Sequence, residues 1–130
     1  VDVFGNHALH FAAPHEGLHT IIIELLDQGH SPHARNNEKR TPLFYARNIK
    51  NANILIESGA DVNCRDEDGN TVLHCLASTD DRELIYLLIE KGADINAENA
   101  DGETPLDIAE SDDVREILIH LGAKVKIAYR

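Results

Sequence analysis

Two kinds of landmark recur along this 130-residue chain at nearly the same interval. One is a leucine near the start of a short predicted helix: Leu9, Leu43, Leu73 and Leu106. The other is a glycine that ends a second predicted helix: Gly29, Gly59, Gly92 and Gly122. Two independent landmarks with one period predict an array of similar units, which bury a core only by stacking on their neighbours.

Each unit predicts the same order of turn, short helix, second helix, glycine stop and extended link. The most complete copy runs from Thr71 to Asn96. Its second helix carries aliphatic residues at helical spacing: Leu84, Leu87 and Leu88. The threonine hydroxyls that precede the short helices are placed to cap them: Thr41, Thr71 and Thr104.

The units differ in length. The stretch from leucine to glycine is longer in the first and third units (9–29 and 73–92) than in the second and fourth (43–59 and 106–122). The missing residues fall between the helices, around 48–53 and 111–113, so either the helices are clipped or the turns are tightened. The second unit also has Lys39 where the others have glycine, which implies strain or an altered turn. In the first unit, the order of Ile and Glu over 21–24 leaves the register of that helix open.

These residues resemble the ankyrin repeat. That family runs Asp-x-x-Gly-x-Thr-Pro-Leu-His, then Ala-Ala, an aliphatic helix and Gly-Ala-Asp-Val-Asn. The last motif is matched at 59–63 and, with Ile in place of Val, at 92–96. The likeness covers about residues 2 to 124. It implies an all-α ankyrin-repeat solenoid of stacked helix-turn-helix units joined by β-hairpin-like loops. The expected single domain spans residues 1–130, with repeats at about 2–34, 35–64, 65–97 and 98–130.

Composition narrows the setting. An apolar content of 42% fits a folded domain. The two cysteines, Cys64 and Cys75, match neither a disulfide framework nor a zinc-finger spacing, so reduced thiols in a cytoplasmic or nuclear protein are expected. Neither a signal peptide nor a membrane-spanning segment is predicted, so no membrane association is expected. Because the chain has no Met, including a first one, we expect a piece of a longer polypeptide or a processed product.

The net charge of −11 is placed unevenly. Residues 1–50 hold five acids and five bases, whereas residues 51–130 hold eighteen acids and seven bases. Such a surface repels phosphate backbones, which argues against nucleic acid as a ligand. A protein partner with a basic surface or segment is the better expectation.

The sequence contains no motif that is typical of a catalytic site. Cys75 lies between His74 and Leu76, at a position that predicts a core residue. The acid pairs at 80–81 and 112–113 stand at helix starts, where carboxylates favour the helix dipole. There is no phosphate-binding glycine loop. The chain is therefore expected to be non-catalytic, with no cofactor, no metal and no small-molecule substrate.

Six of the eight histidines lie in the first unit, between His7 and His33. His15 and His19 are four residues apart, a spacing that brings two imidazoles together on a helix, but Gly17 lies between them. A metal- or pH-responsive first repeat is therefore kept as an alternative. In the resemblance, His10 and His74 occupy the position of a structural hydrogen-bonding histidine.

The resemblance also implies a partner surface made of the loop tips and the concave side of the first helices. An aromatic residue lies at one end of this surface, bases at its centre and acids at its far end, which would orient a partner. The residues assigned to it are Phe4, Asn6, Glu38, Arg40, Arg47, Glu67, Asp68, Asn70, Asp101, Glu103 and Glu110.

Two functions follow from this. The first is a non-catalytic scaffold that binds a partner along the tips and the concave face, and the alternative is a region that docks within, or regulates, a larger multidomain protein. The likeness further implies that Asn63 and Asn96 are candidates for asparaginyl hydroxylation, each with a leucine eight residues earlier. The other interpretation is that both asparagines bond neighbouring backbone turns.

Overall fold

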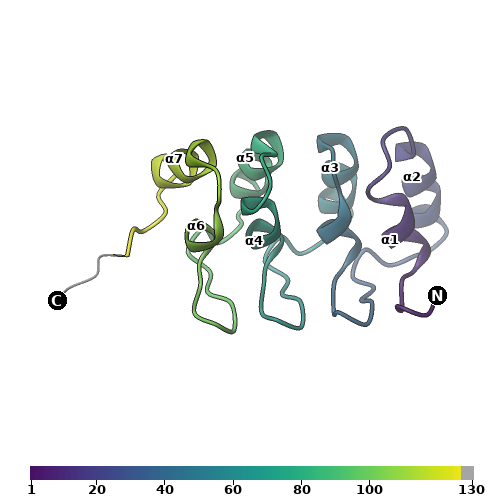
Figure 1. The fold of residues 1–130 in the computed structure, drawn as a ribbon. Coiled ribbons are helices and arrows are strands. Elements are labelled where there is room, and N and C mark those ends of the chain that lie inside the picture. The colour runs from purple at the N-terminus through teal and green to yellow at the C-terminus, as the bar shows by residue number, and fades with distance from the viewer. Residues whose placement is uncertain (127–130) are drawn as a thin grey trace.

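The computed structural model describes residues 1–126, which form four helix pairs (Figure 1). We name the pairs after the predicted units, unit 1 (2–34), unit 2 (35–64), unit 3 (65–97) and unit 4 (98–130). The elements are α1 (Ala8–Ala12) and α2 (His19–Asp27), the 3₁₀ helix η1 (Pro42–Tyr45) and α3 (Ile49–Glu57), α4 (Val72–Ala77) and α5 (Arg82–Glu90), and α6 (Pro105–Ile108) and α7 (Asp112–His120).

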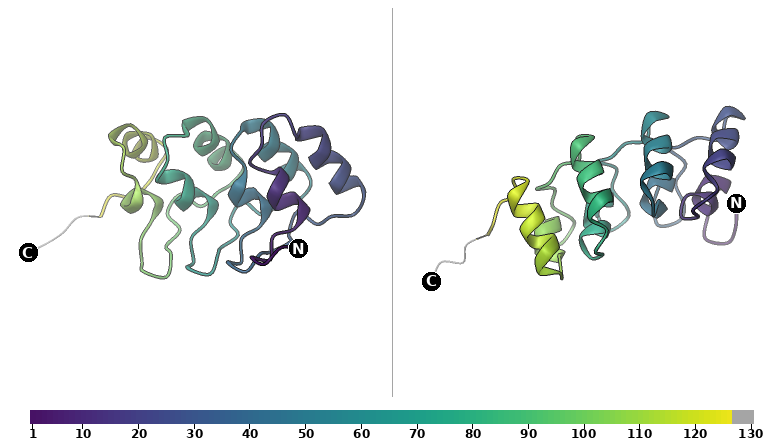
Figure 2. Two further views of the ribbon diagram at one scale, coloured as in Figure 1. Left: turned by 45° about the vertical axis from the view of Figure 1, so that its right-hand side comes forward. Right: turned by 90° about the horizontal axis from the view of Figure 1, so that it is seen from above.

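The helices form two rows with the loops extending from one side, as Figures 1 and 2 show. The first helices contact one another in the order α1, η1, α4 and α6, and the second helices α2, α3 and α5 do the same. Within residues 1–126 the only β-type pairing is an isolated antiparallel bridge between Arg65 and Thr71. The predicted all-α solenoid with hairpin-like loops is confirmed.

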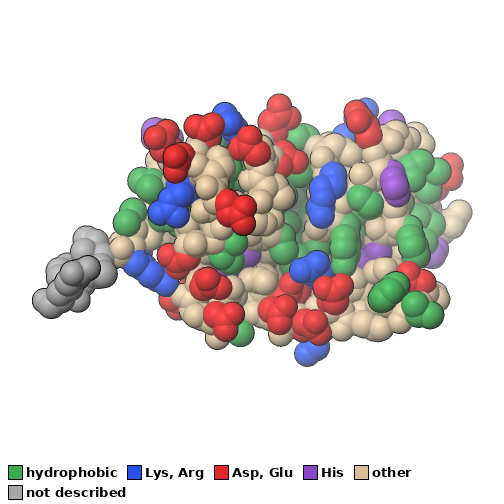
Figure 3. Space-filling view, in the orientation of Figure 1, with side chains coloured by type: hydrophobic (Ala, Val, Ile, Leu, Met, Phe, Trp, Pro, Cys, Tyr) green, Lys and Arg blue, Asp and Glu red, His purple; other side chains and the backbone are tan. Residues whose placement is uncertain are grey.

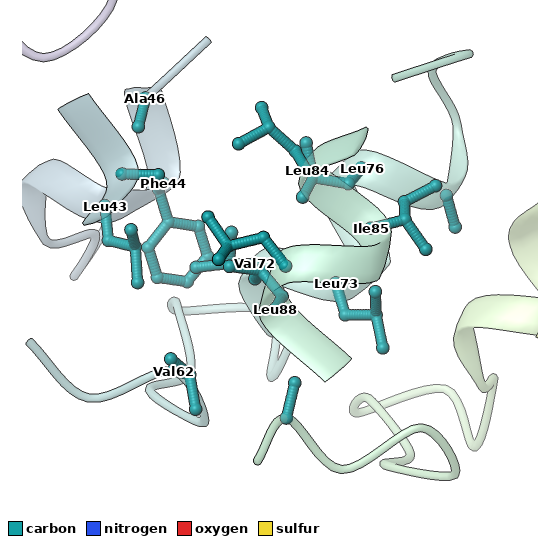
Figure 4. Close-up of a cluster of buried hydrophobic side chains, with 14 of the residues drawn as sticks. Leu43, Phe44, Ala46, Val62, Val72, Leu73, Leu76, Leu84, Ile85 and Leu88 are labelled. Carbon is teal, nitrogen blue, oxygen red and sulfur yellow. The ribbon is translucent and has the colours of Figure 1, made fainter. Parts of the chain in front are cut away.

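The core is aliphatic and runs the length of the stack. The repeated leucine of each first helix is at most 3% exposed, and Leu55, Leu88 and Leu118 of the second helices are at most 1% exposed. Figure 4 shows how η1, α4 and α5 contribute side chains to one cluster, with Phe44 lying between Leu43 and Val72. Each fully buried side chain of this size contributes about 1.5–3 kcal/mol, and every contribution depends on a neighbouring unit.

The short units lose residues both from the first helices and from the turns that follow them. All four second helices have nine residues, whereas the first helices have five in α1, four in η1, six in α4 and four in α6. The turn between the two helices has six residues in unit 1 and four in unit 3, but three in units 2 and 4. Both predicted explanations, clipped helices and tightened turns, therefore contribute to the length difference. In unit 1, Ile22 is 0% exposed and stands three positions before Leu25, as the equally buried Ile85 stands before Leu88, so the helix keeps its register.

The predicted cap at Thr41 is wrong. Thr71 and Thr104 accept the N–H of the third helical residue on their hydroxyls as expected. In η1, the tighter 3₁₀ turn directs the Phe44 N–H to the backbone carbonyl of Thr41, at 3.1 Å. The Thr41 hydroxyl is left buried without a hydrogen-bond partner. A buried hydroxyl without a hydrogen-bond partner lowers the free energy of unfolding by about 1–3 kcal/mol.

Each loop tip is a turn held by one side chain. The first Asp or Asn of the tip accepts the backbone N–H groups two and four residues later, at 2.9–3.0 Å in all four units: Asp2, Asn36, Asp66 and Asn99. Lys39 has φ 61°, against φ 77° for Gly69. The turn is therefore kept in unit 2, and the backbone strain that Lys39 predicted is present.

We predict that Gly69→Ala destabilises the stack more than Gly102→Ala. Both residues have φ of 76–77°, so both variants carry the same left-handed strain of about 1–2 kcal/mol. A Cβ on Gly69 would lie 2.8 Å from the backbone nitrogen of Ala100, whereas a Cβ on Gly102 meets nothing within 4 Å. Urea unfolding should show an additional loss of about 1 kcal/mol for Gly69→Ala. Equal losses would contradict the close packing of the tips.

Candidate partner-binding surface

Backbone hydrogen bonds join each loop tip to the next. The N–H of Asn37 donates to the carbonyl of Phe4 at 2.9 Å, Glu67 donates to Glu38 at 2.8 Å, and Ala100 donates to Asp68 at 3.0 Å. We call this row of bonded tips the tip ladder. Because its bonds use the backbone, the side chains of the tips stay available to solvent and to a partner.

A second link joins the same tips through side chains. At the first junction, the Asn36 amide donates to the Oδ1 of Asn6 at 2.9 Å. At the third junction, Asn99 donates to Asn70 in the same way, also at 2.9 Å. The second junction places Arg40 and Asp66 at these two positions.

Arg40 and Asp66 form an ion pair in place of the amide link. The Nε of Arg40 lies 3.1 Å from the Oδ2 of Asp66, whose side chain is 1% exposed. The guanidinium also lies 5.8 Å from the Phe44 ring centre and 6.0 Å from that of Tyr45. Arg40 was predicted to offer its charge to a partner, but its guanidinium pairs with Asp66 inside the protein. Asp66 lacks the amide N–H that Asn36 and Asn99 donate, so a donor is needed on the other side of this junction.

Histidines supply a third link. In unit 3, His74 Nδ1 accepts the Thr71 N–H at 3.0 Å, and Nε2 lies 2.8 Å from the Glu103 carbonyl. In unit 1, His10 contacts the N–H of His7 and the carbonyl of Arg40 in the same way. Burial lowers the pKa of both histidines, against the bonded carbonyls, which raise it. Both rings are structural, as the resemblance implied.

Unit 4 uses a carboxylate where units 1 and 3 place the histidine. Asp107 Oδ2 accepts the Thr104 N–H at 2.9 Å and lies 2.8 Å from the Nζ of Lys126. Lys126 also donates to the Gly102 carbonyl at 2.7 Å. The hydrogen bond and charge of Lys126 lower the pKa of Asp107. Lys126 thus bonds the tip of unit 4 as the histidines bond their neighbouring tips.

Six acidic residues assigned to the partner surface are exposed: Glu38, Glu67, Asp68, Asp101, Glu103 and Glu110. In Figure 3 acidic side chains gather along the loops of units 3 and 4, while hydrophobic side chains gather over the loop of unit 1. The tip ladder holds Glu67 and Asp68 beside Glu38 and Ala100. Phe4 is 66% exposed at the unit 1 end.

The other assigned residues have their polar groups engaged. Asn6 and Asn70 are the acceptors of the amide links. Arg47 is exposed, but its guanidinium donates to the carbonyls of Phe44 and Ala46 at 3.0 and 3.2 Å. These contacts satisfy the last carbonyls of the clipped η1 helix.

A shallow hollow of about 320 Å³ lies between units 2, 3 and 4, and its lining includes Arg40, His74, Cys75 and Ile108. Cys75 was predicted as core and is instead partly exposed in this hollow. Burial raises the pKa of its thiol, and the charge of Arg40 opposes that change. The position two residues after each repeated leucine is partly or fully exposed in all four units: Phe11, Tyr45, Cys75 and Ile108. All four residues are apolar, so the sequence carried no sign of this exposure.

Within residues 1–126, no three His, Cys, Asp or Glu side chains are grouped so as to hold a metal ion. Gly17, with φ 90°, separates His15 from His19, which begins α2. The two imidazoles therefore do not share a helix. Across the same residues, no helix has the length and hydropathy needed to span a membrane.

The model of the family described as "Ankyrin repeats (3 copies)" matches residues 1–66 and 47–128. The chain belongs to the ankyrin repeat family. It is also similar to the ankyrin repeat-containing protein P1E11.10 of Schizosaccharomyces pombe, with 38% identity over 64 residues. That segment is 47% of this chain and 31% of the fission-yeast protein, so the chain spans about a third of that relative.

The ankyrin asparagines singled out for hydroxylation bond neighbouring backbone turns. Asn63 donates to the Gly92 carbonyl at 3.1 Å and accepts the Asp94 N–H at 2.7 Å. Asn96 accepts the Lys124 N–H at 2.9 Å. These contacts agree with the structural interpretation, and modification stays a prediction.

We predict that Asp66→Asn destabilises the ankyrin stack by about 1–3 kcal/mol, because Arg40 loses its partner at a largely buried site. The double variant Arg40→Asn, Asp66→Asn should recover most of that loss, since it recreates the amide link of the other two junctions. Urea unfolding of the single and double variants measures both effects. Additive losses would show that the two junction types are not interchangeable.

We further predict that stability falls as the pH drops below 6.5. The folded state lowers the pKa of His10 and His74 from 6.5, so their contribution is complete above pH 6.5 and is lost as the pH falls through the folded-state values. His74→Asn keeps an acceptor for the Thr71 N–H and should flatten this dependence in thermal melts. His30→Asn, at an exposed position, is the matched control. Identical profiles for the two variants would contradict the prediction.

Proposed function

We propose that this ankyrin domain is a non-catalytic scaffold that binds a basic protein segment along the tip ladder. The observation that carries the proposal is the row of exposed carboxylates on backbone-bonded tips, chiefly Glu67, Asp68 and Asp101. Family membership supports the class of function, because ankyrin repeats are typically protein-interaction modules.

The tips are suited to this role because they are both charged and rigid. Each tip is fixed by its own Asp or Asn turn and by a hydrogen bond to the next tip. The tips therefore lose little conformational entropy when a partner binds. The summed charge of the carboxylates makes the electrostatic potential over units 3 and 4 negative, which steers a basic partner toward them. Phe4, 66% exposed, offers an aromatic contact at the far end of the row.

The same charge distribution favours protein over nucleic acid as the ligand. The reduced state that we expect for Cys64 and Cys75 supports a cytoplasmic or nuclear location. We propose no cofactor and no small-molecule substrate, in keeping with the raised pKa of the Cys75 thiol, which makes it a poor nucleophile.

We predict that the triple variant Glu67→Lys, Asp68→Lys, Asp101→Lys weakens capture of Lys- and Arg-rich peptides about tenfold or more at low salt. Fluorescence anisotropy with labelled basic peptides and sequence-matched acidic peptides measures the effect. The melting temperature should stay close to that of the parent chain, because the three side chains are exposed.

The matched control reverses three exposed carboxylates at the ends of α2, α3 and α5: Asp27, Glu57 and Glu90. It makes the same change in net charge away from the tips. Equal weakening by both triple variants would show that only net charge matters, and unchanged binding in the tip variant would remove the tips from the interface.

A further inference from the structure

An apolar groove covers the outer side of unit 1. It has a volume of about 460 Å³, and its lining includes Ala8, Phe11, Ala12, Leu18, Ile21 and Leu25. Phe11 is 53% exposed and Ile21 is 44% exposed. We call this surface the N-terminal face. A contiguous apolar patch of this kind on a folded protein marks a site of association.

Three positions of this face, Ala8, Ile21 and Leu25, have equivalents in units 2, 3 and 4 that are buried. All four second helices have nine residues, so their positions correspond one to one. Ile21 corresponds to residues that are at most 1% exposed: Asn51, Leu84 and Val114. Leu25, partly exposed, corresponds to Leu55, Leu88 and Leu118, which are also at most 1% exposed. Ala8, exposed in the first helix, corresponds to Pro42, Val72 and Pro105, all buried.

The preceding unit is what covers these positions. Helix α2 packs on α3, and α1 packs on η1. The side chain of Asn51 enters the end of α1, where its amide donates to the carbonyls of Ala13 and His15 at 3.0 Å each. The N-terminal face is therefore a fourth copy of an interface that the stack forms three times.

The opposite end of the stack has different chemistry. The position held by Ile22, Ala52 and Ile85, all at most 1% exposed, is Arg115 in α7. The Arg115 guanidinium donates to the carbonyl of Leu106 at 3.0 Å. Exposed Asp112 and Glu116 lie on the same helix. The two ends therefore differ at this position, which is aliphatic in the first three units and charged in α7, although Ile119 of α7 is 45% exposed.

We propose that the N-terminal face is the docking site of one further ankyrin-type helix pair, joined ahead of Val1 in the same polypeptide. The pair packs on α1 and α2 as these helices pack on η1 and α3. Ile21 corresponds to Asn51, whose amide donates hydrogen bonds to unit 1. Because Ile21 has no polar group, its contact with the added helix pair would be aliphatic only. Residues 1–50 are balanced in charge, so long-range repulsion does not oppose its approach.

The test supplies such a pair from the chain itself. A copy of residues 65–97 is fused directly ahead of Val1, which occupies the position of Glu98 and so keeps the register of the array. The fusion should raise the midpoint of thermal unfolding by about 5 °C or more in one cooperative transition. A separate transition for the added unit, or an unchanged midpoint, would overturn the proposal.

Two controls sharpen the result. The same fusion carrying Ile21→Glu should show no gain, whereas Ile21→Glu in the 130-residue chain should fold normally because the side chain is 44% exposed. Light scattering after size exclusion should find the 130-residue chain monomeric. A dimer that Ile21→Glu dissociates would assign the N-terminal face to a second copy and overturn the proposed occupant. The tip variants leave all of these results unaffected.

Discussion

The structure depends on the register between neighbouring loop tips. The backbone bond from each tip to the next sets the spacing of the units, and that spacing decides which aliphatic residues meet in the core. The side-chain links repeat this register, through amides at two junctions and through Arg40 and Asp66 at the other. Because a lone helix pair cannot bury its apolar stripe, the tips and the core stabilise each other.

Much of the fold could be predicted because its determinants are local and repeated. The leucine and glycine period marks the units, and the turn residues mark the tips. The Arg40–Asp66 pair was missed because it joins residues far apart in the sequence, and its geometry exists only once the tips are in register. Comparison of the tip sequences could have indicated the pair, because Arg40 and Asp66 stand where asparagines bond to each other at the other two junctions.

The candidate site was predicted less completely, for physical reasons. Exposed carboxylates follow from turn chemistry, so Glu67, Asp68 and Asp101 were found. The half-buried Cys75 was assigned to the core because the faces of a six-residue helix cannot be told apart by periodicity alone. The cap at Thr41 failed although α6, which also has four residues and begins with a proline, keeps its cap at Thr104. Asp107 returns a hydrogen bond to the Thr104 N–H, whereas Phe44 has no side-chain acceptor at the corresponding position.

Unit 2 gathers the local costs of the array. It holds the strained Lys39, the orphan hydroxyl of Thr41 and the four-residue 3₁₀ helix, and its link to unit 3 is an ion pair. These costs are offset by the contacts that η1 and α3 make with the helices of units 1 and 3. Unit 2 is therefore the part of the array that depends most on having a folded neighbour on each side.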